Sequence, residues 1–215
     1  MKLIPDSELV KIPVKDNGER LIRVKERCPK IAIRLAAYVR KDGKNFCDDA
    51  CLVREGVAER LTVAQSHLPE GYRLMLRCGY RPLALQKTRY EWMLNKLRKK
   101  HPEWNQERLR DETSRCVAPP DIIPPHSTGG AVDLSIIGGR GRQLDMGERL
   151  GYFTEKTYTH SEKISPEAGK NRELLISVMS KAGFINYPTE WWHWSYGDRY
   201  WAAVLKKRYS IYDGI

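Results

Sequence analysis

Two short motifs carry the residues of this sequence that could hold a metal ion. The first runs from Pro125 to Asp133, and the second is Glu190-Trp191-Trp192-His193. Together they supply two imidazoles and two carboxylates, namely His126, His193, Asp133 and Glu190. Two imidazoles and one carboxylate leave the fourth position of a tetrahedral zinc open, which is the arrangement of a hydrolytic site. The same donors also suit other divalent ions, so the set alone does not select zinc.

The residues that follow Gly129 and Gly130 alternate between apolar and less apolar types, as in a half-buried strand. The apolar side holds Val132, Leu134 and Ile136, and the other side holds Ala131, Asp133 and Ser135. We therefore expect a strand over 131–137 with Asp133 on its less apolar face. The glycine turn should bring His126 back toward that carboxylate.

An extended second motif would bury its tryptophans and turn His193 toward the site. Glu190 lies three residues before His193, and the three ligands are already supplied without it, so we expect it to act as the general base toward a metal-activated water. Taken singly, either motif also fits an ordinary turn or a capping residue. Both motifs together, in this order, favour a metal site.

The motifs resemble those of the D-alanyl-D-alanine dipeptidases of the vancomycin-resistance type, within the wider zinc D,D-peptidase group that includes lysostaphin-like and hedgehog-like proteins. That family's pattern Ser-x-His-x-x-Gly-x-Ala-x-Asp is matched except at its first position, where Pro124 replaces serine. Glu190-Trp191-Trp192-His193 has the form typical of the dipeptidase branch. Gly79-Tyr80-Arg81-Pro82, Asp145-Met146-Gly147 and the stretch that ends at His160 also resemble it. The resemblance runs from about residue 20 to about residue 200.

The resemblance implies one zinc ion per chain, held by His126, Asp133 and His193. It implies Glu190 as general base and acid, and Arg81 as a catalytic residue near the scissile bond, where a planar, always-charged guanidinium can stabilise an oxyanion. Alternatively, Arg81 is a surface arginine in a turn before Pro82. We expect the substrate to be contacted by Ser127, Tyr80 and Glu148.

Two departures concern the substrate. In the dipeptidases an aspartate after the Met-Gly pair binds the free ammonium of the substrate, and that place falls at Gly151 here. Glu148 or Glu155 could replace it, although each is equally well explained as a solvated charge. Pro124 removes a hydroxyl that could help to bind substrate. We expect the chemistry to be kept and the selection of free dipeptides to be altered.

The predicted function is zinc-dependent hydrolysis of D-alanyl-D-alanine to free D-alanine in peptidoglycan-precursor metabolism. One alternative is a zinc D,D-carboxypeptidase that acts on longer muropeptide stems. A second is a zinc domain that binds peptide or cell wall without catalysis. The presence of Glu190 and the open metal position weigh against the second alternative, because a structural zinc usually has four protein ligands.

Composition describes an ordinary globular chain of 215 residues with a net charge of +11. The charge raises nucleic acid as a partner. The densest basic stretch, Lys96 to His101, ends a helix-like segment, where cations are favourable for the helix itself, and acidic residues follow it. A small D-amino-acid peptide is therefore the expected partner, and nothing indicates an oligomeric state. The sequence shows no membrane-spanning run and no secretory leader, which predicts a cytoplasmic protein, or a periplasmic one if a leader was removed.

Five cysteines in no regular framework favour reduced thiols. Cys47 and Cys51 could be a second metal site, but their spacing fits no common zinc pattern, and half-buried thiols are the preferred reading.

The pattern predicts one α+β domain over 1–215, with helices packed on a small, mainly antiparallel sheet that carries the zinc site. Strands are expected near 31–38, 72–78 and 131–137, and helices over 52–68, 83–100, 103–115 and 171–182. Residues 1–27 should be irregular and partly extended, with 21–24 extended, the proline-rich 117–125 should be irregular, and the tail 199–215 is left unassigned apart from a short helix. His160 is expected either beside the metal ligands or exposed in its loop, whereas His67 and His101 lie at helix ends, away from the site.

Overall fold

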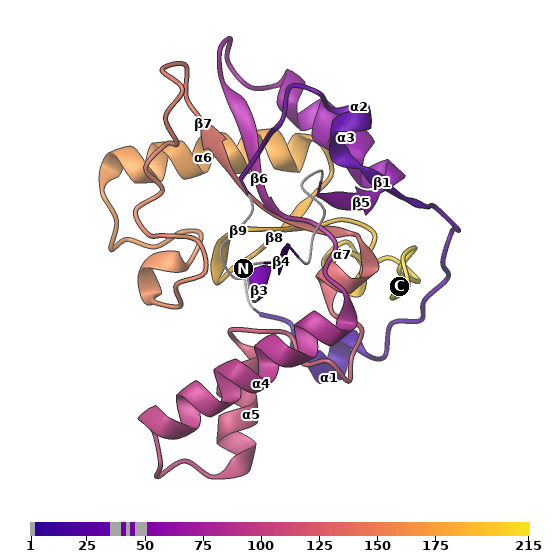
Figure 1. The fold of residues 1–215 in the computed structure, drawn as a ribbon, viewed down its shortest axis with the longest axis vertical. Helices are drawn as coiled ribbons and strands as arrows, with labels where there is room; N and C mark the ends of the chain where they lie inside the picture. The colour runs from indigo at the N-terminus through magenta and orange to yellow at the C-terminus, as the bar shows by residue number, and fades with distance from the viewer. Residues whose placement is uncertain (1–2, 35–39, 42–43, 46–50) are drawn as a thin grey trace.

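The centre of the fold is a five-stranded sheet in the order β2-β6-β7-β9-β8 (Figure 1). The strands are β2 (Ala32–Ile33), β6 (Arg73–Cys78), β7 (Ala131–Ile137), β8 (Ile185–Tyr187) and β9 (Glu190–Ser195). β2 is parallel to β6, and the other neighbouring pairs are antiparallel. The structure is a computed structural model that describes residues 3–34, 40–41, 44–45 and 51–215. The predicted α+β class with a mainly antiparallel sheet is confirmed.

One face of the sheet packs against two helices, α3 (Glu55–Ser66) and α6 (Pro166–Lys181). Leu61 of α3 and Leu175 of α6 share a buried apolar cluster with Leu134 of β7 and Trp194 of β9. α6 begins five residues before the predicted 171–182. The Ser165 hydroxyl accepts a hydrogen bond from a backbone N–H of the first turn at 3.1 Å, and proline occupies the first helical position. Both features start a helix, so the capping signal lay upstream of the apolar periodicity.

β7 is buried on both faces, which corrects the expectation of a half-buried strand. All seven of its residues are buried, including Asp133 at 2% exposure and Ser135 at 0%. Val132 and Leu134 belong to the apolar cluster under the helices. The alternation placed Asp133 correctly on the sheet face that points away from the helices. That face is covered by segments from distant parts of the chain and does not meet bulk solvent.

The segment predicted as a helix over 52–68 begins instead as a strand. β5 (Leu52–Arg54) pairs antiparallel with β1 (Leu21–Arg23), and Ile22 lies opposite Val53. Both side chains are buried, at 5% and 0% exposure. Pairing with a distant strand thus overrides the helical spacing in the first three residues, and α3 starts at Glu55.

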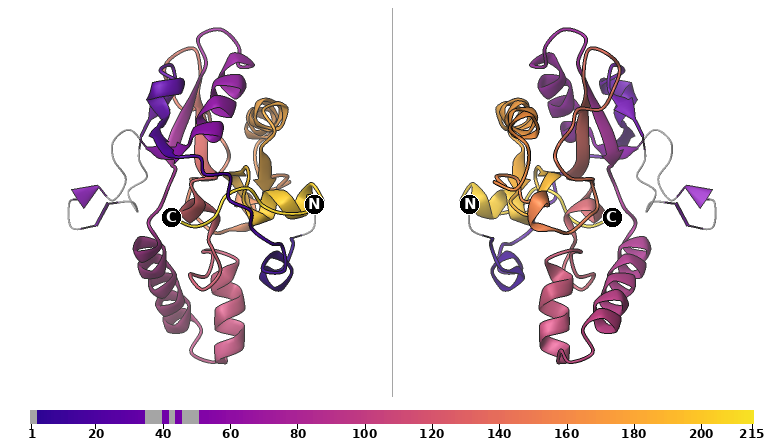
Figure 2. Two further views of the ribbon diagram at one scale, coloured as in Figure 1. Left: turned by 90° about the vertical axis from the view of Figure 1, so that its right-hand side faces the viewer. Right: turned by 90° about the vertical axis from the view of Figure 1, so that its left-hand side faces the viewer.

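Two helices extend together away from the sheet (Figures 1 and 2). α4 (Leu83–Lys100) has the predicted bounds, and its last turn carries the basic residues noted in the sequence. α5 (Gln106–Ser114) starts three residues later than predicted, because the Asn105 side chain caps it by accepting the Arg108 N–H at 2.9 Å.

The remaining elements are short. They are α1 (Asp6–Leu9), α2 (Val24–Arg27), β3 (Arg40–Lys41), β4 (Lys44–Asn45), η2 (Pro125–Thr128), η3 (Glu155–Thr157) and α7 (Arg199–Val204). The N-terminal segment pairs with the tail through a bridge between Val14 and Ser210, and the Asn17 N–H donates to the Ile211 carbonyl at 3.1 Å. Half of the predicted 31–38 strand, residues 35–38, lies outside the described residues, and so does Cys47.

The cysteines that the structure describes are Cys28, Cys51, Cys78 and Cys116, and the first three are buried. Cys51 is completely buried rather than half-buried. Among the residues placed by the structure, no helix has the length and apolar character needed to cross a membrane.

Candidate active site

A tight glycine turn places His126 against β7. His126 lies in η2, and Gly129 follows with φ +73°, a left-handed conformation that favours glycine. A Cβ on Gly130 would lie 2.5 Å from the backbone oxygen of Tyr196, so no side chain fits there. Buried Arg54 holds the turn from outside by donating from Nε to the Thr128 carbonyl at 2.8 Å.

Asp133 joins the two histidines. The β7–β9 register sets Asp133 opposite His193. Asp133 Oδ1 lies 3.2 Å from His126 Nε2 and 3.1 Å from His193 Nδ1, and the imidazole rings are 4.9 Å apart. All three side chains are buried. The structure therefore brings together the three residues that the sequence suggested as metal ligands.

The second nitrogen of each imidazole has its own partner. His126 Nδ1 lies 2.8 Å from the Gly79 carbonyl, which can only accept a hydrogen bond, so Nδ1 carries a proton and Nε2 faces Asp133. His193 Nε2 lies 3.4 Å from Ser195 Oγ, which leaves Nδ1 facing the same carboxylate. Such outer partners fix the orientation of an imidazole that binds a metal.

The electrostatics favour an ion pair between Asp133 and His126. Burial raises the pKa of Asp133, but the charge of His126 and hydrogen bonds from both histidines lower it well below 3.8. Burial lowers the pKa of His126, and the neighbouring Asp133 charge raises it to about 9. The proton shared at this point is the one that a bound cation would displace.

Glu190, the first residue of β9, lies beside the cluster. Its carboxylate belongs to a group with Asp133 and His193 whose ligand atoms all lie within 4.8 Å of one another. Burial raises the pKa of Glu190 to about 7; the charge of His193 lowers it, whereas that of Asp133 raises it. A carboxyl group that titrates near neutrality can take up and return a proton at physiological pH.

Cys78 is a neighbour that the sequence argument missed. It lies opposite Asp133 in the β6–β7 pairing, and its Sγ falls within 4.8 Å of ligand atoms of His126 and Asp133. Arg81 Nη2 donates to the same sulfur at 3.3 Å. The one feature of the sequence that could have indicated Cys78 was its place at the end of a predicted strand, just before Arg81. Cys78 thus offers a second possible donor beside the two histidines.

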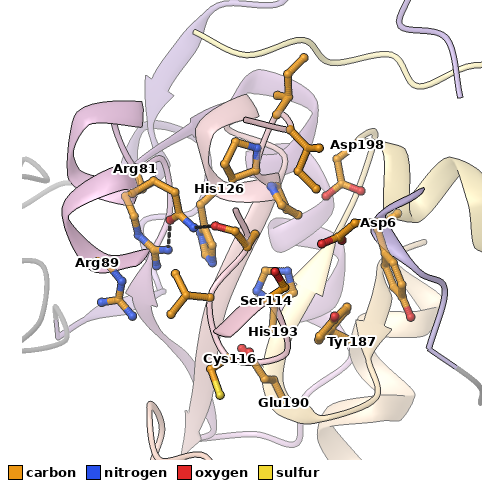
Figure 3. Close-up of a pocket in the computed structure, with 18 of the residues that line it drawn as sticks. Asp6, Arg81, Arg89, Ser114, Cys116, His126, Tyr187, Glu190, His193 and Asp198 are labelled. Carbon is orange, nitrogen blue, oxygen red and sulfur yellow. Dashed lines mark hydrogen bonds between the residues drawn. The ribbon is translucent and has the colours of Figure 1, made fainter. Parts of the chain in front are cut away.

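Arg81 is buried next to Asp133 and is held from its other side. Its Nη2 lies 3.7 Å from Asp133 Oδ2, and its Nη1 donates to Gln86 Oε1 at 2.7 Å. Gln86 in turn donates to the Ala118 carbonyl at 2.7 Å. Figure 3 shows Arg81 and Arg89 on the same side of the pocket that contains the histidines. The guanidinium is therefore a fixed cationic group at the site, not a surface side chain.

The three residues expected to contact substrate lie outside the cavity lining. The buried Ser127 hydroxyl donates to the Arg81 carbonyl at 2.9 Å, so it supports the backbone of Arg81. The Tyr80 hydroxyl donates to the Ile215 carbonyl at 2.8 Å. Glu148 accepts from the Arg149 N–H at 2.8 Å and from the Thr154 hydroxyl. Each side chain has its polar group bound to the protein itself.

His160 is exposed in its loop. Its side chain is 70% exposed and lies 3.8 Å from Glu173. Of the two places expected for it, the structure shows the one away from the metal ligands. The loop as a whole does border the site, because Gly151 and Phe153 line the cavity.

The cavity has a volume of about 980 Å³ including its open mouth. Distant segments supply its walls: α1, residues 114–125, the loop at 151–153 and α7. Besides the expected residues, the polar lining includes Asp6, Cys116, Tyr187, Asp198 and Tyr200 (Figure 3). No local pattern marks these residues, since only the tertiary fold brings them to the cavity.

The chain is similar to several known proteins. A family model described as D-ala-D-ala dipeptidase, Peptidase M15, matches residues 21–213, which includes most of the tail left unassigned from the sequence. The D-alanyl-D-alanine dipeptidase of a Synechocystis strain is 25% identical over 230 residues, covering 95% of this chain and 92% of that protein. That of Enterococcus faecium is 32% identical over 133 residues, covering 60% and 64%. A solved structure of VanYB in complex with D-Alanine-D-Alanine covers 74% of this chain and 78% of its own, with 16% identity and a TM-score of 0.48. Because the family model spans nearly the whole length, the chain belongs to the D-Ala-D-Ala dipeptidase family, Peptidase M15.

Proposed function

We propose that this protein is a zinc-dependent peptidase that hydrolyses D-alanyl-D-alanine to D-alanine. The observation that carries the proposal is the buried contact of two imidazole nitrogens with one oxygen of Asp133, next to Glu190. Family membership and the names of relatives that match the chain support the same activity. We also infer one domain over 1–215, because residues 14–17 pair with residues 210–211.

The donor set fits zinc. Zinc bonds to imidazole nitrogen and carboxylate oxygen are about 2.0–2.2 Å long, so neighbouring ligands of a tetrahedral ion lie about 3.3 Å apart. The two nitrogens lie 3.2 and 3.1 Å from Asp133 Oδ1, close to that spacing. His126, Asp133 and His193 would hold the ion, and their outer partners already direct the required nitrogens inward.

Zinc bound there would supply a Lewis acid that polarises a peptide carbonyl and acidifies water. Glu190 takes the proton of the attacking water and returns it to the leaving amine, a role for which its carboxylate is placed beside the ligand atoms of Asp133 and His193. Arg81, fixed by Gln86, presents donors to the negative charge that develops on the carbonyl oxygen. Arg81 and the three candidate metal ligands are buried in the wall of the cavity.

The test is release of D-alanine by zinc-loaded protein from D-Ala-D-Ala, with N-acetyl-D-Ala-D-Ala and L-Ala-L-Ala alongside. Hydrolysis of the free D-dipeptide alone is the expected result. Hydrolysis of the acetylated substrate at a similar rate would replace the proposal with a D,D-carboxypeptidase that acts on longer stems. Absence of release from every substrate would refute the hydrolytic function.

His126→Ala provides the matched control for the metal. It should lose both zinc and turnover, since it removes one of three ligands. Zinc content is measured by mass spectrometry of the purified protein after dialysis. Full zinc occupancy in His126→Ala would contradict the ligand assignment and would point to Cys78 as a donor.

A further inference from the structure

Two buried polar atoms in the wall of the cavity have no hydrogen-bond partner within the described chain. They are Asp198 Oδ2 and the Tyr200 hydroxyl oxygen. The two residues are 1% and 2% exposed. Buried polar atoms nearly always have a partner, so a pair of such atoms that borders a cavity indicates a polar group of a ligand.

Within the described chain, the Asp198 carboxylate interacts with the backbone of Trp201 and with the nearby side chain of Ser195. Oδ1 caps α7 by accepting the Trp201 N–H at 2.8 Å. Capping a helix needs one oxygen and no negative charge, because asparagine serves as well as aspartate. The second oxygen has no hydrogen-bond partner in the described chain. Burial raises the pKa of the Asp198 carboxyl, while the Trp201 N–H and the nearby Ser195 side chain lower it, so a cationic group of a ligand beside Oδ2 would stabilise the charged form.

Asp198 and Tyr200 belong to one side of the cavity. Burial raises the pKa of the Tyr200 hydroxyl, and the charge of Asp198 raises it further, which reflects their proximity. The Tyr200 ring lies 5.1 Å from that of Tyr187, whose ring lies 5.8 Å from that of His193. The ring of Tyr187 thus connects the Tyr200 side of the cavity to a proposed metal ligand.

The cavity has opposite charges on its two sides. Figure 3 shows Asp198 and Asp6 on one side, Arg81 and Arg89 on the other, and the histidines between them. Burial raises the pKa of Asp6, as does the charge of Asp121. Carboxylates and phenol rings attract a cation, and guanidinium groups attract a carboxylate. This pattern is complementary to a small peptide with both termini free.

We propose that Asp198 and Tyr200 form the subsite for the cationic amino end of the substrate, with Asp6 adding negative charge. The inference rests on the proposed peptidase function and names the part of the cavity that selects free over blocked peptides. It also explains how the cavity can take an ammonium although Gly151, which lines it, has no carboxylate.

The experiment measures binding separately from turnover. Zinc-loaded Glu190→Gln protein is titrated by calorimetry with D-Ala-D-Ala and with N-acetyl-D-Ala-D-Ala. The free dipeptide should bind more tightly. Adding Asp198→Asn, which keeps the helix cap, should weaken binding of the free dipeptide about 10- to 150-fold, the usual effect of losing a hydrogen bond to a charged group. Binding of the acetylated peptide should change less than about threefold.

Asp111→Asn in α5 is the control, because it removes an exposed carboxylate outside the cavity. An unchanged preference for the free dipeptide in Asp198→Asn would overturn the proposal, and so would failure of the free dipeptide to bind Glu190→Gln. If Asp198→Asn does not fold, Tyr200→Phe decides, with a loss of preference expected and an unchanged preference refuting the subsite. Hydrolysis of D-Ala-D-Ala by the wild type is measured separately. If the dipeptide binds in a way that depends on Asp198 but is not hydrolysed, the peptidase function is rejected and the subsite is retained.

Discussion

Arg172 ties the loop at the cavity to helix α6. Its side chain is 1% exposed. It donates to the backbone carbonyls of Met146 at 2.8 and 2.5 Å, Lys156 at 2.6 Å and Tyr158 at 2.5 Å. Burial lowers the pKa of Arg172 to about 10. The buried guanidinium of Arg172 therefore holds this loop in place through hydrogen bonds to the loop's backbone carbonyls.

Arg172→Met keeps most of the apolar stem and removes every donor. Four carbonyl groups lose a hydrogen bond, those of Met146, Lys156, Tyr158 and, at 3.4 Å, Thr159, and at about 1 kcal/mol for each net hydrogen bond the loss is about 4 kcal/mol. Relief of the buried charge offsets part of this loss, so we expect about 2–3 kcal/mol. For a chain of this size, each kcal/mol lowers Tm by about 2–4 °C, which predicts a decrease of about 4–12 °C.

The assay is thermal unfolding followed by circular dichroism, together with steady-state kinetics. Because Gly151 and Phe153 in the same loop line the cavity, KM should rise while zinc content stays the same. Lys170→Met, an exposed change on the same helix, is the control and should leave Tm nearly unchanged. A decrease of less than 2 °C in Arg172→Met, or an equal decrease in the control, would refute the role of Arg172.

Three further predictions follow from single contacts. Glu190→Gln should retain zinc and lower kcat about 10²–10⁴-fold, as expected when a general base is removed; zinc loss equal to that of a ligand variant would contradict its role. Gly130→Ala should destabilise the protein, because the new Cβ would lie 2.5 Å from a backbone oxygen. The control is Gly169→Ala in α6, whose Cβ meets nothing within 4 Å and which should stabilise the protein by about 0.5–1 kcal/mol. Urea unfolding measures both variants, and equal changes in unfolding free energy would refute the steric argument. Burial raises the pKa of Asp16, but backbone hydrogen bonds and the charge of Arg54 lower it below 3.8. The stabilisation that ionised Asp16 gives the folded state is therefore present above pH 3.8 and disappears as pH falls through the folded-state pKa. Wild type should have a higher Tm than Asp16→Asn near neutral pH, and this difference should vanish in acid. A difference that persists at pH 2 would contradict the prediction.

The sequence predicted the elements whose signals are local. The alternation over 131–137 and the apolar spacing over 83–100 both gave correct bounds, because each segment contains its own period and its own ends. The sequence also predicted that His126, Asp133 and His193 lie together. A glycine turn just before the strand allows His126 to fold back toward Asp133, and an extended second motif directs His193 to the same place.

Features that depend on distant partners were missed. Leu52 has helical spacing with the residues after it, yet it forms a strand because β1 supplies backbone partners. Cys78 reaches the site through the β6–β7 register, and Asp198 reaches the cavity through the position of α7. Ser127 matched a plausible role in binding, but its hydroxyl is already committed to a backbone carbonyl. A one-dimensional pattern does not contain these contacts.

The pairing of the N-terminal segment with the tail has a consequence for the order in which the protein is made. Lys15 and Asn17 donate backbone hydrogen bonds to the carbonyls of Ser210 and Ile211, and Arg54 donates to the carbonyl of Asp213. During synthesis the N-terminal segment therefore cannot form these hydrogen bonds until almost two hundred further residues have left the ribosome. Closing such long loops slows folding. The early part of the chain, including the arginine that holds the His126 turn, remains without these partners throughout translation of the middle.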